Sequence, residues 1–292
     1  MNTLILKGLP VSISIKKKLS KKINELKEKD IIPYLAVILV GNNPASEIYV
    51  KSKQKTFIKN NCKSKIFNFK KDILEVDLIN FIKELNNNKN IHGILIQLPL
   101  PEHLNEQSIL KKVSPNKDVD GFNPFNLGYL LGGAPKFIPC TPYGCLKILE
   151  YYNIDVQSKH VVIIGRSNIV GKPLMALLSQ KFNIGNATVT ICHTGTKNIT
   201  YFSKQADILI VAIGKANYLT KDMVKKGVHI IDVGINRIKD NSQKGYSIVG
   251  DVDYINMLGK AQSITPVPGG VGPMTVTMLL YNTVQAARES LK

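Results

Sequence analysis

Several features that define other classes of protein are scarce or missing in this 292-residue sequence. It contains no tryptophan and only four cysteines, none of them spaced as a CxxC pair. Neither a metal site nor a disulfide framework is therefore indicated, and we expect reduced, mostly buried thiols. No apolar run approaches the length of a membrane span. Residues 1–20 lack the apolar core and cleavage site of a signal peptide, so we expect a soluble, cytoplasmic protein without a membrane partner.

Arginine is also scarce, although the chain is strongly basic. The formal charge is +18, yet only three of the 39 basic residues are arginines. Recognition of bases and phosphates favours the bidentate fork of arginine, and the lysines here are scattered with few aromatic neighbours. We therefore expect no nucleic-acid partner. The excess of lysine still favours anionic small molecules through a general positive field.

Strand and helix patterns alternate along almost the whole chain. Short Val- and Ile-rich runs predict strands at 34–41, 65–69, 92–98, 160–165, 187–192, 207–214 and 228–234. Such runs are typical of parallel strands covered on both faces. The helical patterns between them, such as 73–87, indicate α/β architecture with right-handed crossovers.

The pattern restarts after about residue 143, which predicts two domains with a ligand cleft between them. We expect an N-terminal α/β/α catalytic domain of residues 1–142 plus 273–292. Residues 143–272 are expected to form a Rossmann-type dinucleotide-binding domain. The last helical pattern, from Pro273 to about Ser290, is expected to return to the first domain.

The segment GNNPASEIYVKSKQK at 41–55 carries three alternating lysines. At about 100° per residue in a helix, Lys53 lies about 40° round from Tyr49, one turn further on. Lys51 and Lys55 lie on the opposite face and are expected to be solvated. Tyr49 and Lys53 therefore form a pair that a simple charge run does not explain.

The segment VVIIGRSNIVGKP at 161–173 predicts a strand, a tight glycine turn and the start of a helix, which can bind phosphate. Gly165 allows the turn, and Ser167 stands where the usual fingerprint has its second glycine. No acid follows the next strand, where NAD-binding folds hold the ribose. Arg166 and the hydroxyl of Thr194 suit a 2′-phosphate instead, which favours NADP over NAD.

Three further segments combine polar groups with restricted backbone. Gln97 ends a predicted parallel strand in GILIQLPLPEH, where α/β ligand sites collect; the prolines after it can include a cis bond. In PNKDVDGFNPFNLG, a carboxylate can bind a planar amidine-like edge, while an Asx-turn or helix cap accounts for Asp118. ITPVPGGVGPMTV at 264–276 can bring backbone close to a flat ligand, or act as a hinge.

Together these segments resemble the bifunctional methylenetetrahydrofolate dehydrogenase/cyclohydrolase family over nearly the whole chain. The similarity rests on VGNNPASEIYVKSKQK, GILIQLPLP, KDVDGF, PCTPYGC, GRSNIVGKP, IDVGINR, VGDVD and ITPVPGGVGPMTV, in this order. It implies NADP-dependent oxidation of 5,10-methylenetetrahydrofolate to 5,10-methenyltetrahydrofolate, followed by hydrolysis to 10-formyltetrahydrofolate. It also implies a homodimer.

The resemblance assigns roles to individual residues. Lys53 is implied as the catalytic lysine, with Tyr49 near the pterin and Gln97 tuning the lysine. The implied folate-binding residues are Asp120, Gly269, Gly270 and Val271. The implied cofactor-binding residues are Gly165, Arg166, Ser167, Thr194 and Ile235. Asn123 and Gly195 depart from the pattern of many relatives, which carry histidine and a larger or basic side chain there.

Three alternatives fit parts of the sequence. One is another two-domain NADP dehydrogenase, such as one resembling shikimate dehydrogenase, and folate binding separates it. The second is a basic binding protein for RNA or DNA, which predicts steeply salt-dependent polynucleotide binding. The third is a dehydrogenase of the same family that has lost the hydrolytic step. The lysine surplus also suggests capture of folates with polyglutamate tails.

Overall fold

The computed structural model of the protein describes residues 2–182, 184–240 and 245–291. They form two compact units. Unit 1 consists of Met1–Ile13 and Thr141–Thr275, and unit 2 of Ser14–Cys140 and Val276–Lys292. Within the described ranges, no helix is long and apolar enough to cross a bilayer.

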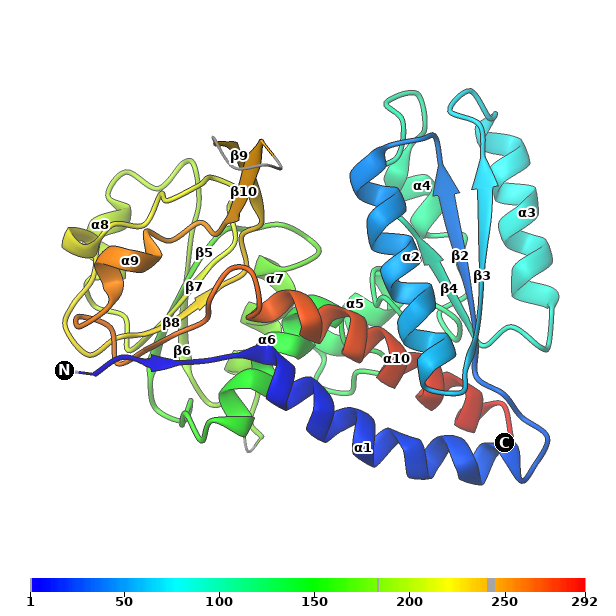
Figure 1. The fold of residues 1–292 in the computed structure, drawn as a ribbon, viewed down its shortest axis with the longest axis horizontal. Coiled ribbons are helices and arrows are strands. Elements are labelled where there is room, and N and C mark those ends of the chain that lie inside the picture. The colour runs from blue at the N-terminus through cyan, green and yellow to red at the C-terminus, as the bar shows by residue number, and fades with distance from the viewer. Residues whose placement is uncertain (1, 183, 241–244, 292) are drawn as a thin grey trace. The chain divides into compact units, whose positions relative to one another are not determined.

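Unit 2 is built on a three-stranded parallel sheet in the order β3-β2-β4, with helices alongside it (Figure 1). The strands are β2 (Tyr34–Val40), β3 (Lys63–Phe69) and β4 (Gly93–Ile96), and the helices are α2 (Pro44–Lys59), α3 (Glu75–Asn87), α4 (Glu106–Leu110) and α5 (Pro124–Leu131). Ile38 and Val40 of β2 form a core cluster with Leu78 and Ile82 of α3. Since side chains alternate along a strand, Leu35, Val37 and Leu39 face the other side, where they are also buried. Burial of both faces confirms what the apolar runs predict.

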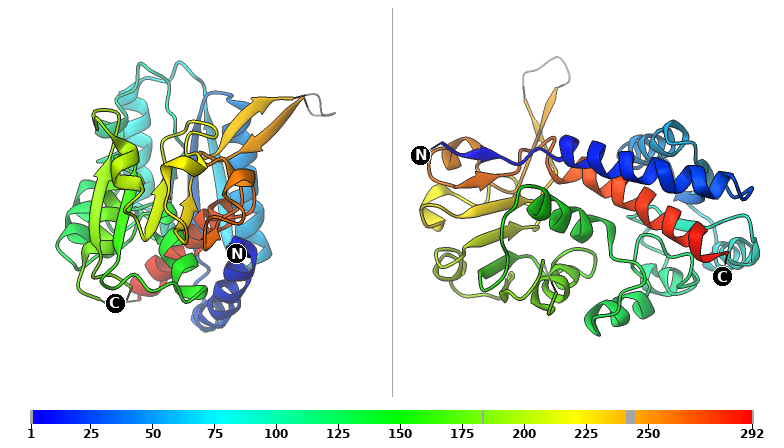
Figure 2. Two further views of the ribbon diagram at one scale, coloured as in Figure 1. Left: turned by 90° about the vertical axis from the view of Figure 1, so that its left-hand side faces the viewer. Right: turned by 90° about the horizontal axis from the view of Figure 1, so that it is seen from below.

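Two long helices, α1 (Gly8–Lys27) and α10 (Val271–Glu289), each begin in unit 1 and end in unit 2. Their later turns lie side by side in unit 2, where the Lys22 ammonium is 5.6 Å from the centroid of the Tyr281 ring (Figures 1 and 2). The Asn282 amide of α10 donates to the carbonyl oxygens of Val119 (2.8 Å) and Ile138 (3.0 Å). These bonds tie the C-terminal helix to the chain of unit 2.

Unit 1 contains a six-stranded parallel sheet in the order β1-β11-β8-β7-β5-β6. Its strands are β1 (Leu4–Ile5), β5 (His160–Ile164), β6 (Thr188–Cys192), β7 (Ile208–Val211), β8 (His229–Asp232) and β11 (Ser263–Ile264). Its shorter helices are α6 (Cys140–Tyr151, whose first residue belongs to unit 2), α7 (Gly171–Ser179), α8 (Ile199–Ser203), α9 (Tyr254–Met257) and the 3₁₀ turn η1 (Lys221–Met223). The strand after β6 returns to the other side of β5, so the carboxyl ends of β5 and β7 form a topological switch point, where doubly wound folds bind ligands.

Two features of unit 1 differ from the sequence-based expectation. Residues 1–13 belong to unit 1 rather than to the first predicted domain, because Leu4 and Ile5 pair with Ser263 and Ile264. An antiparallel hairpin of β9 (Asn236–Lys239) and β10 (Tyr246–Val249) extends away from the six-stranded sheet (Figure 2). All seven predicted strands are present, each within a few residues of its expected bounds.

Candidate active site

Helix α2 presents the lysine that the sequence singles out. Asn43 caps the helix, since its side-chain oxygen accepts the backbone N–H groups of Ala45 (3.0 Å) and Ser46 (3.1 Å). Lys51 is exposed and pairs with Glu47 at 3.2 Å. This cap and the Lys51 pair fix the start of the helix and leave the opposite face, with Lys53, for another role.

Lys53 meets Gln97 at the carboxyl end of the sheet of unit 2. The Lys53 ammonium donates to the Gln97 side-chain oxygen at 2.9 Å, and the Gln97 amide nitrogen donates to the carbonyl oxygen of Leu98 at 2.7 Å. The second bond fixes the orientation of the amide, so its oxygen must face the lysine. The Leu98–Pro99 peptide bond is cis. Tyr49, one turn before Lys53, leaves 44% of its surface exposed.

Asp120 completes a partly buried cluster with Lys53 and the buried Cys140. Burial lowers the pKa of the Lys53 ammonium, and the negative charge of Asp120 opposes that shift. Burial likewise raises the pKa of the Asp120 carboxyl, opposed by the charge of Lys53 and a hydrogen bond from the Cys140 thiol. Next to Asp120, Gly121 has a φ of +77°, and a side chain there would meet the backbone nitrogen of Pro139 at 2.7 Å. The turn therefore requires glycine to hold Asp120 against the chain before α6.

The other acid of this loop, Asp118, is structural. Its carboxylate accepts the backbone N–H groups of Phe122 (3.1 Å) and Asn123 (2.8 Å) and the Asn126 amide (2.8 Å). These bonds support the structural interpretation of Asp118, but they reach four and five residues along the chain, so the motif is neither the predicted Asx-turn nor a helix cap. Asn123, the departure from many relatives, caps α5: its side-chain oxygen accepts the backbone N–H of Phe125 at 2.9 Å.

In unit 1, the turn after β5 lies at the switch point of the sheet. Gly165 has a φ of +129°, and a side chain there would meet the carbonyl oxygen of Ala212, just after β7, at 2.2 Å. A side chain at Gly171 would meet the carbonyl oxygen of Gly165 at 2.0 Å. The Ser167 hydroxyl accepts the backbone N–H of Val170 at 3.1 Å. Both glycines are thus required by close packing, and the hydroxyl occupies part of the helix start.

The end of β6 faces this turn with basic and hydroxyl groups. The Arg166 guanidinium lies 3.4 Å from Nε2 of His193. The Thr196 hydroxyl accepts the backbone N–H of His193, while Thr194 is exposed. No carboxylate occurs in residues 193–198, all of which are described. A ribose hydroxyl thus has no acidic partner here, and the residues present fit a 2′-phosphorylated dinucleotide.

A carboxylate network that sequence reasoning missed holds the loops after β7 and β8. Asp251 accepts the backbone N–H groups of Ile213 (2.7 Å), Gly214 (3.0 Å) and Lys215 (2.9 Å). Asp232 accepts those of Gly234, Asp251 and Val252 at 2.9–3.0 Å. The motifs IDVGINR and VGDVD carry these two acids, but only their spatial proximity reveals the network. Ile235, predicted to bind cofactor, follows this network and leaves 50% of its surface exposed.

The glycine-rich loop before α10 is tightly built. A side chain at Gly270 would meet the carbonyl oxygen of Pro266 at 2.6 Å, and Gly269 has a φ of +107°. Val271 is 4% exposed, and the Val267–Pro268 bond is cis. Gly269 to Val271 lie in unit 1, whereas Lys53, Gln97 and Asp120 lie in unit 2. The structure thus groups the predicted residues into two sets, one in each unit.

A doubly wound sheet with a glycine turn at its switch point in one unit, together with a partly buried lysine–amide–carboxylate cluster in the other unit, defines a dinucleotide-dependent enzyme of the α/β class. The comparisons identify the family. The tetrahydrofolate dehydrogenase/cyclohydrolase catalytic domain matches residues 6–120, and the NAD(P)-binding domain of the same family matches residues 139–291. The chain belongs to the tetrahydrofolate dehydrogenase/cyclohydrolase family.

Relatives of known name and structure cover the whole chain. The bifunctional protein FolD of Nautilia profundicola is 52% identical over 99% of this chain and 98% of its own length. The crystal structure of the bifunctional FolD methylenetetrahydrofolate dehydrogenase/cyclohydrolase from Campylobacter jejuni is 48% identical, with a TM-score of 0.93, and covers 98% of this chain and 99% of its own. The Trypanosoma brucei enzyme, complexed with NADP cofactor and inhibitor, is 32% identical with a TM-score of 0.94, covering 100% of this chain and 99% of its own.

Proposed function

We propose that this chain catalyses the NADP-dependent oxidation of 5,10-methylenetetrahydrofolate to 5,10-methenyltetrahydrofolate and the hydrolysis of that product to 10-formyltetrahydrofolate. The reactions supply one-carbon units. The observation that carries the proposal is the bond between Lys53 and Gln97 beside Asp120, in a chain of this family. Membership of the family also sets aside a shikimate-type dehydrogenase and a nucleic-acid-binding protein.

Hydrolysis needs a proton acceptor and then a proton donor. Because burial lowers the pKa of Lys53, more of the neutral amine is available near neutral pH. We assign Lys53 to take a proton from water as the water oxygen bonds to the methenyl carbon. The resulting ammonium returns a proton to N5 as the bond between that carbon and N5 breaks. The second water proton is released when the formyl carbonyl forms, which balances the positive charge of the substrate.

The groups around Lys53 orient the lysine and bind the folate. Gln97 orients the Lys53 ammonium, and Asp120 is assigned to accept two N–H bonds from the pterin edge. Tyr49 is assigned to pack near the pterin. The loop of Gly269, Gly270 and Val271 is proposed as a further folate contact.

The oxidation needs a hydride acceptor, which NADP⁺ supplies when bound. We assign its pyrophosphate to the turn of Gly165 and Ser167, and its 2′-phosphate to Arg166 and Thr194. Ile235 is assigned to the nicotinamide half. The arrangement that supports NADP is the basic, acid-free end of β6 beside Arg166.

Three finer properties complete the proposal. We propose that the chain forms a homodimer, which sedimentation velocity tests. We propose a cytoplasmic location, supported by four buried, free cysteines. Polyglutamate tails are proposed to strengthen binding of the substrate.

A spectrophotometric assay with methylenetetrahydrofolate tests the reaction. We expect NADPH to appear faster than NADH under matched conditions, without accumulation of the methenyl product. Lys53→Met is expected to abolish hydrolysis while folate binding stays measurable, and the control Lys51→Met to behave like the native chain, since Lys51 is exposed. Persistent, stoichiometric methenyl product with the native chain would mean a dehydrogenase alone. Undiminished hydrolysis by Lys53→Met would remove this lysine from the mechanism.

A further inference from the structure

A cavity of about 770 Å³ lies in unit 2 at the amino-terminal end of the three-stranded sheet. Its lining includes the first residues of β2 and β3, Tyr34 and Lys63, and His92, which directly precedes β4. Gln97, the partner of Lys53, follows β4 at the other end. Strand β2 has seven residues, so the two ends are about 20 Å apart. The cavity is therefore separate from the candidate active site.

The cavity carries more positive than negative charge. The charged residues that line it are Lys63, Lys89, Lys117, Lys136, Asp30 and Glu289. Lys136 pairs with Glu289 at 2.9 Å. Lys63, Lys89 and Lys117 form no ion pair with any residue that the structure describes. Four ammonium groups against two carboxylates leave two positive charges to be balanced by a ligand or by solvent ions.

Hydrogen bonds within the fold hold two of the donor groups in place, the Lys117 ammonium and the His92 ring. The Lys117 ammonium donates to the carbonyl oxygens of Leu85 (3.0 Å) and Asn88 (2.6 Å) at the end of α3, which leaves its third N–H free for another acceptor. His92 is only 8% exposed, and its Nδ1 accepts the backbone N–H of Tyr34 at 3.2 Å. In the neutral ring Nε2 then carries the hydrogen. Within the described ranges Nε2 has no hydrogen-bond partner, so a buried donor is available at the cavity wall.

The rest of the wall is partly apolar. Ile31, Ile32, Ile91 and Ala286 line the cavity beside the polar groups. Ligand sites commonly combine such apolar walls with a few fixed polar groups. A ligand that matches both parts has an apolar body and a head group with two negative charges.

We propose that this cavity binds an organic phosphate monoester, with its head group at Lys63, Lys89, Lys117 and His92 and its apolar body against the isoleucines. A phosphate monoester carries close to two negative charges at neutral pH and offers three terminal acceptor oxygens. It therefore matches the unbalanced charge, and its three terminal oxygens can accept hydrogen bonds from several of these donors at once. A single carboxylate has half the charge and one oxygen fewer.

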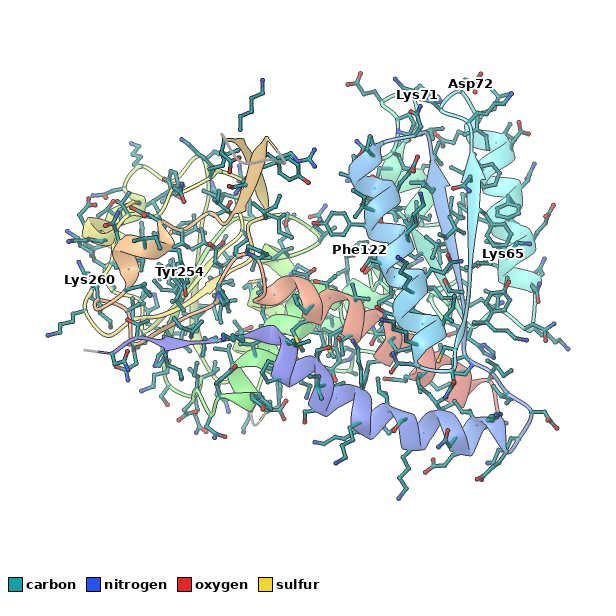
Figure 3. The ribbon with its side chains drawn as sticks, in the orientation of Figure 1. Lys65, Lys71, Asp72, Phe122, Tyr254 and Lys260 are labelled. Carbon is teal, nitrogen blue, oxygen red and sulfur yellow. The ribbon has the colours of Figure 1, made fainter. Side chains whose placement is uncertain are left out.

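Titration calorimetry of the full chain with 1-naphthyl phosphate tests the site, with saturating NAD⁺, which carries no phosphate monoester, present at the cofactor-binding residues. The variant Lys63→Gln/Lys89→Gln removes two cationic contacts, and we expect its dissociation constant to rise about tenfold or more. The control Lys65→Gln/Lys83→Gln makes the same charge change on β3 and α3 (Lys65 is labelled in Figure 3), outside the cavity lining. We expect less than a twofold rise for the control.

Several outcomes would overturn the proposal. Equal weakening in both double variants would assign the binding to the general positive field of the chain. No heat at millimolar 1-naphthyl phosphate would exclude the site, as would equally tight binding of uncharged 1-naphthol. Citrate binding as tightly as 1-naphthyl phosphate would exclude a phosphate-specific site. Circular dichroism and melting of each variant, unchanged from the native chain, ensure that a loss of binding reflects lost contacts.

Discussion

Three lysines of one helix show how environment rather than residue type determines chemistry. Lys51 and Lys55 are exposed and Lys53 is partly buried, although all three lie within five residues of α2. Helical spacing predicts this separation, because Lys53 shares its face with Tyr49. Sequence alone could not place the Cys140 thiol beside Asp120, since these residues meet only through the fold. The lowered pKa of Lys53 is therefore a property of the folded unit.

The coupling between Lys53 and Asp120 can be measured directly. The negative charge of Asp120 favours the Lys53 ammonium. Asp120→Asn removes that charge and should lower the pKa of Lys53 further. The measurement is a pH titration of the Lys53 Cε resonance in ¹³C-lysine-labelled protein, assigned by its loss in Lys53→Met. Asp72→Asn, in the loop after β3 (Figure 3), is the control and should leave the titration unchanged. An unchanged or raised pKa in Asp120→Asn would contradict the coupling.

At the scale of elements, the sequence predicts what is local and misses what depends on distant pairing. The strands of both sheets carry apolar runs that are visible in short stretches of the sequence. The helix cap at Asn43 is likewise predicted from Asn43 and the proline after it. Strand β1 has two residues and exists because it pairs with β11, far along the chain. Strands β9 and β10 pair as a hairpin in which no residue is fully buried, so the sequence has no buried apolar face that would predict it. The Asp232 and Asp251 network is likewise non-local.

The turn after β5 offers a stability test of one element. Gly165→Ala places a methyl group against the carbonyl oxygen of Ala212 at a φ that favours glycine. We expect a loss of about 2–3 kcal/mol in the free energy of unfolding, together with weaker NADP binding. Gly128→Ala in α5 is the matched control: nothing lies within 4 Å of the added carbon, and alanine favours a helix by about 0.5–1 kcal/mol. Urea denaturation measures both, and similar stabilities of the two variants would refute the steric argument.

The loop after β8 should make stability depend on pH. Burial, with a smaller contribution from Asp251, raises the pKa of Asp232 from 3.8 to about 7, although three backbone N–H bonds oppose the shift. Because the pKa of Asp232 is higher in the folded state than in the unfolded state, its protonated carboxyl makes its full contribution to stability below about pH 4. That contribution is lost as the pH rises to about 7. Urea unfolding between pH 5 and pH 8 should therefore show a decline of roughly 1–4 kcal/mol.

The variant Asp232→Asn isolates this contribution. It should lose the pH-dependent component, so that the stability difference from the native chain is larger at pH 5 than at pH 8. The control is Asp253→Asn, because the Asp253 carboxylate accepts only the Asn256 amide among the residues described. This variant should keep the native dependence of unfolding free energy on pH. A constant difference between native chain and Asp232→Asn across this range would show that the carboxyl does not titrate there.

For the molecule as a whole, the sequence predicts both units and most of the residues of the candidate site. The sequence does not predict that the N-terminal segment is divided between the units, because helix α1 begins in unit 1 and ends in unit 2. The basic cavity in unit 2 could not be predicted from the sequence either, since its lysines come from four separate segments. Charge summed over the chain indicates an affinity for anions, but only the fold shows where lysines outnumber the acidic residues beside them.

The net charge of +18 belongs to the whole chain and should strengthen the binding of highly anionic substrates. A folate with a long polyglutamate tail carries many negative charges and is attracted by the positive field, whereas a substrate with one glutamate is attracted much less. Because salt screens this field over about 8 Å at physiological ionic strength, KM for the long-tailed substrate should rise several-fold between about 50 and 300 mM salt. KM for the single-glutamate substrate should change less than about twofold over the same range. Steady-state assays with both substrates, at fixed NADP⁺, decide the matter. Parallel salt dependences would show that the lysines do not act on the tail, and that their excess serves another purpose.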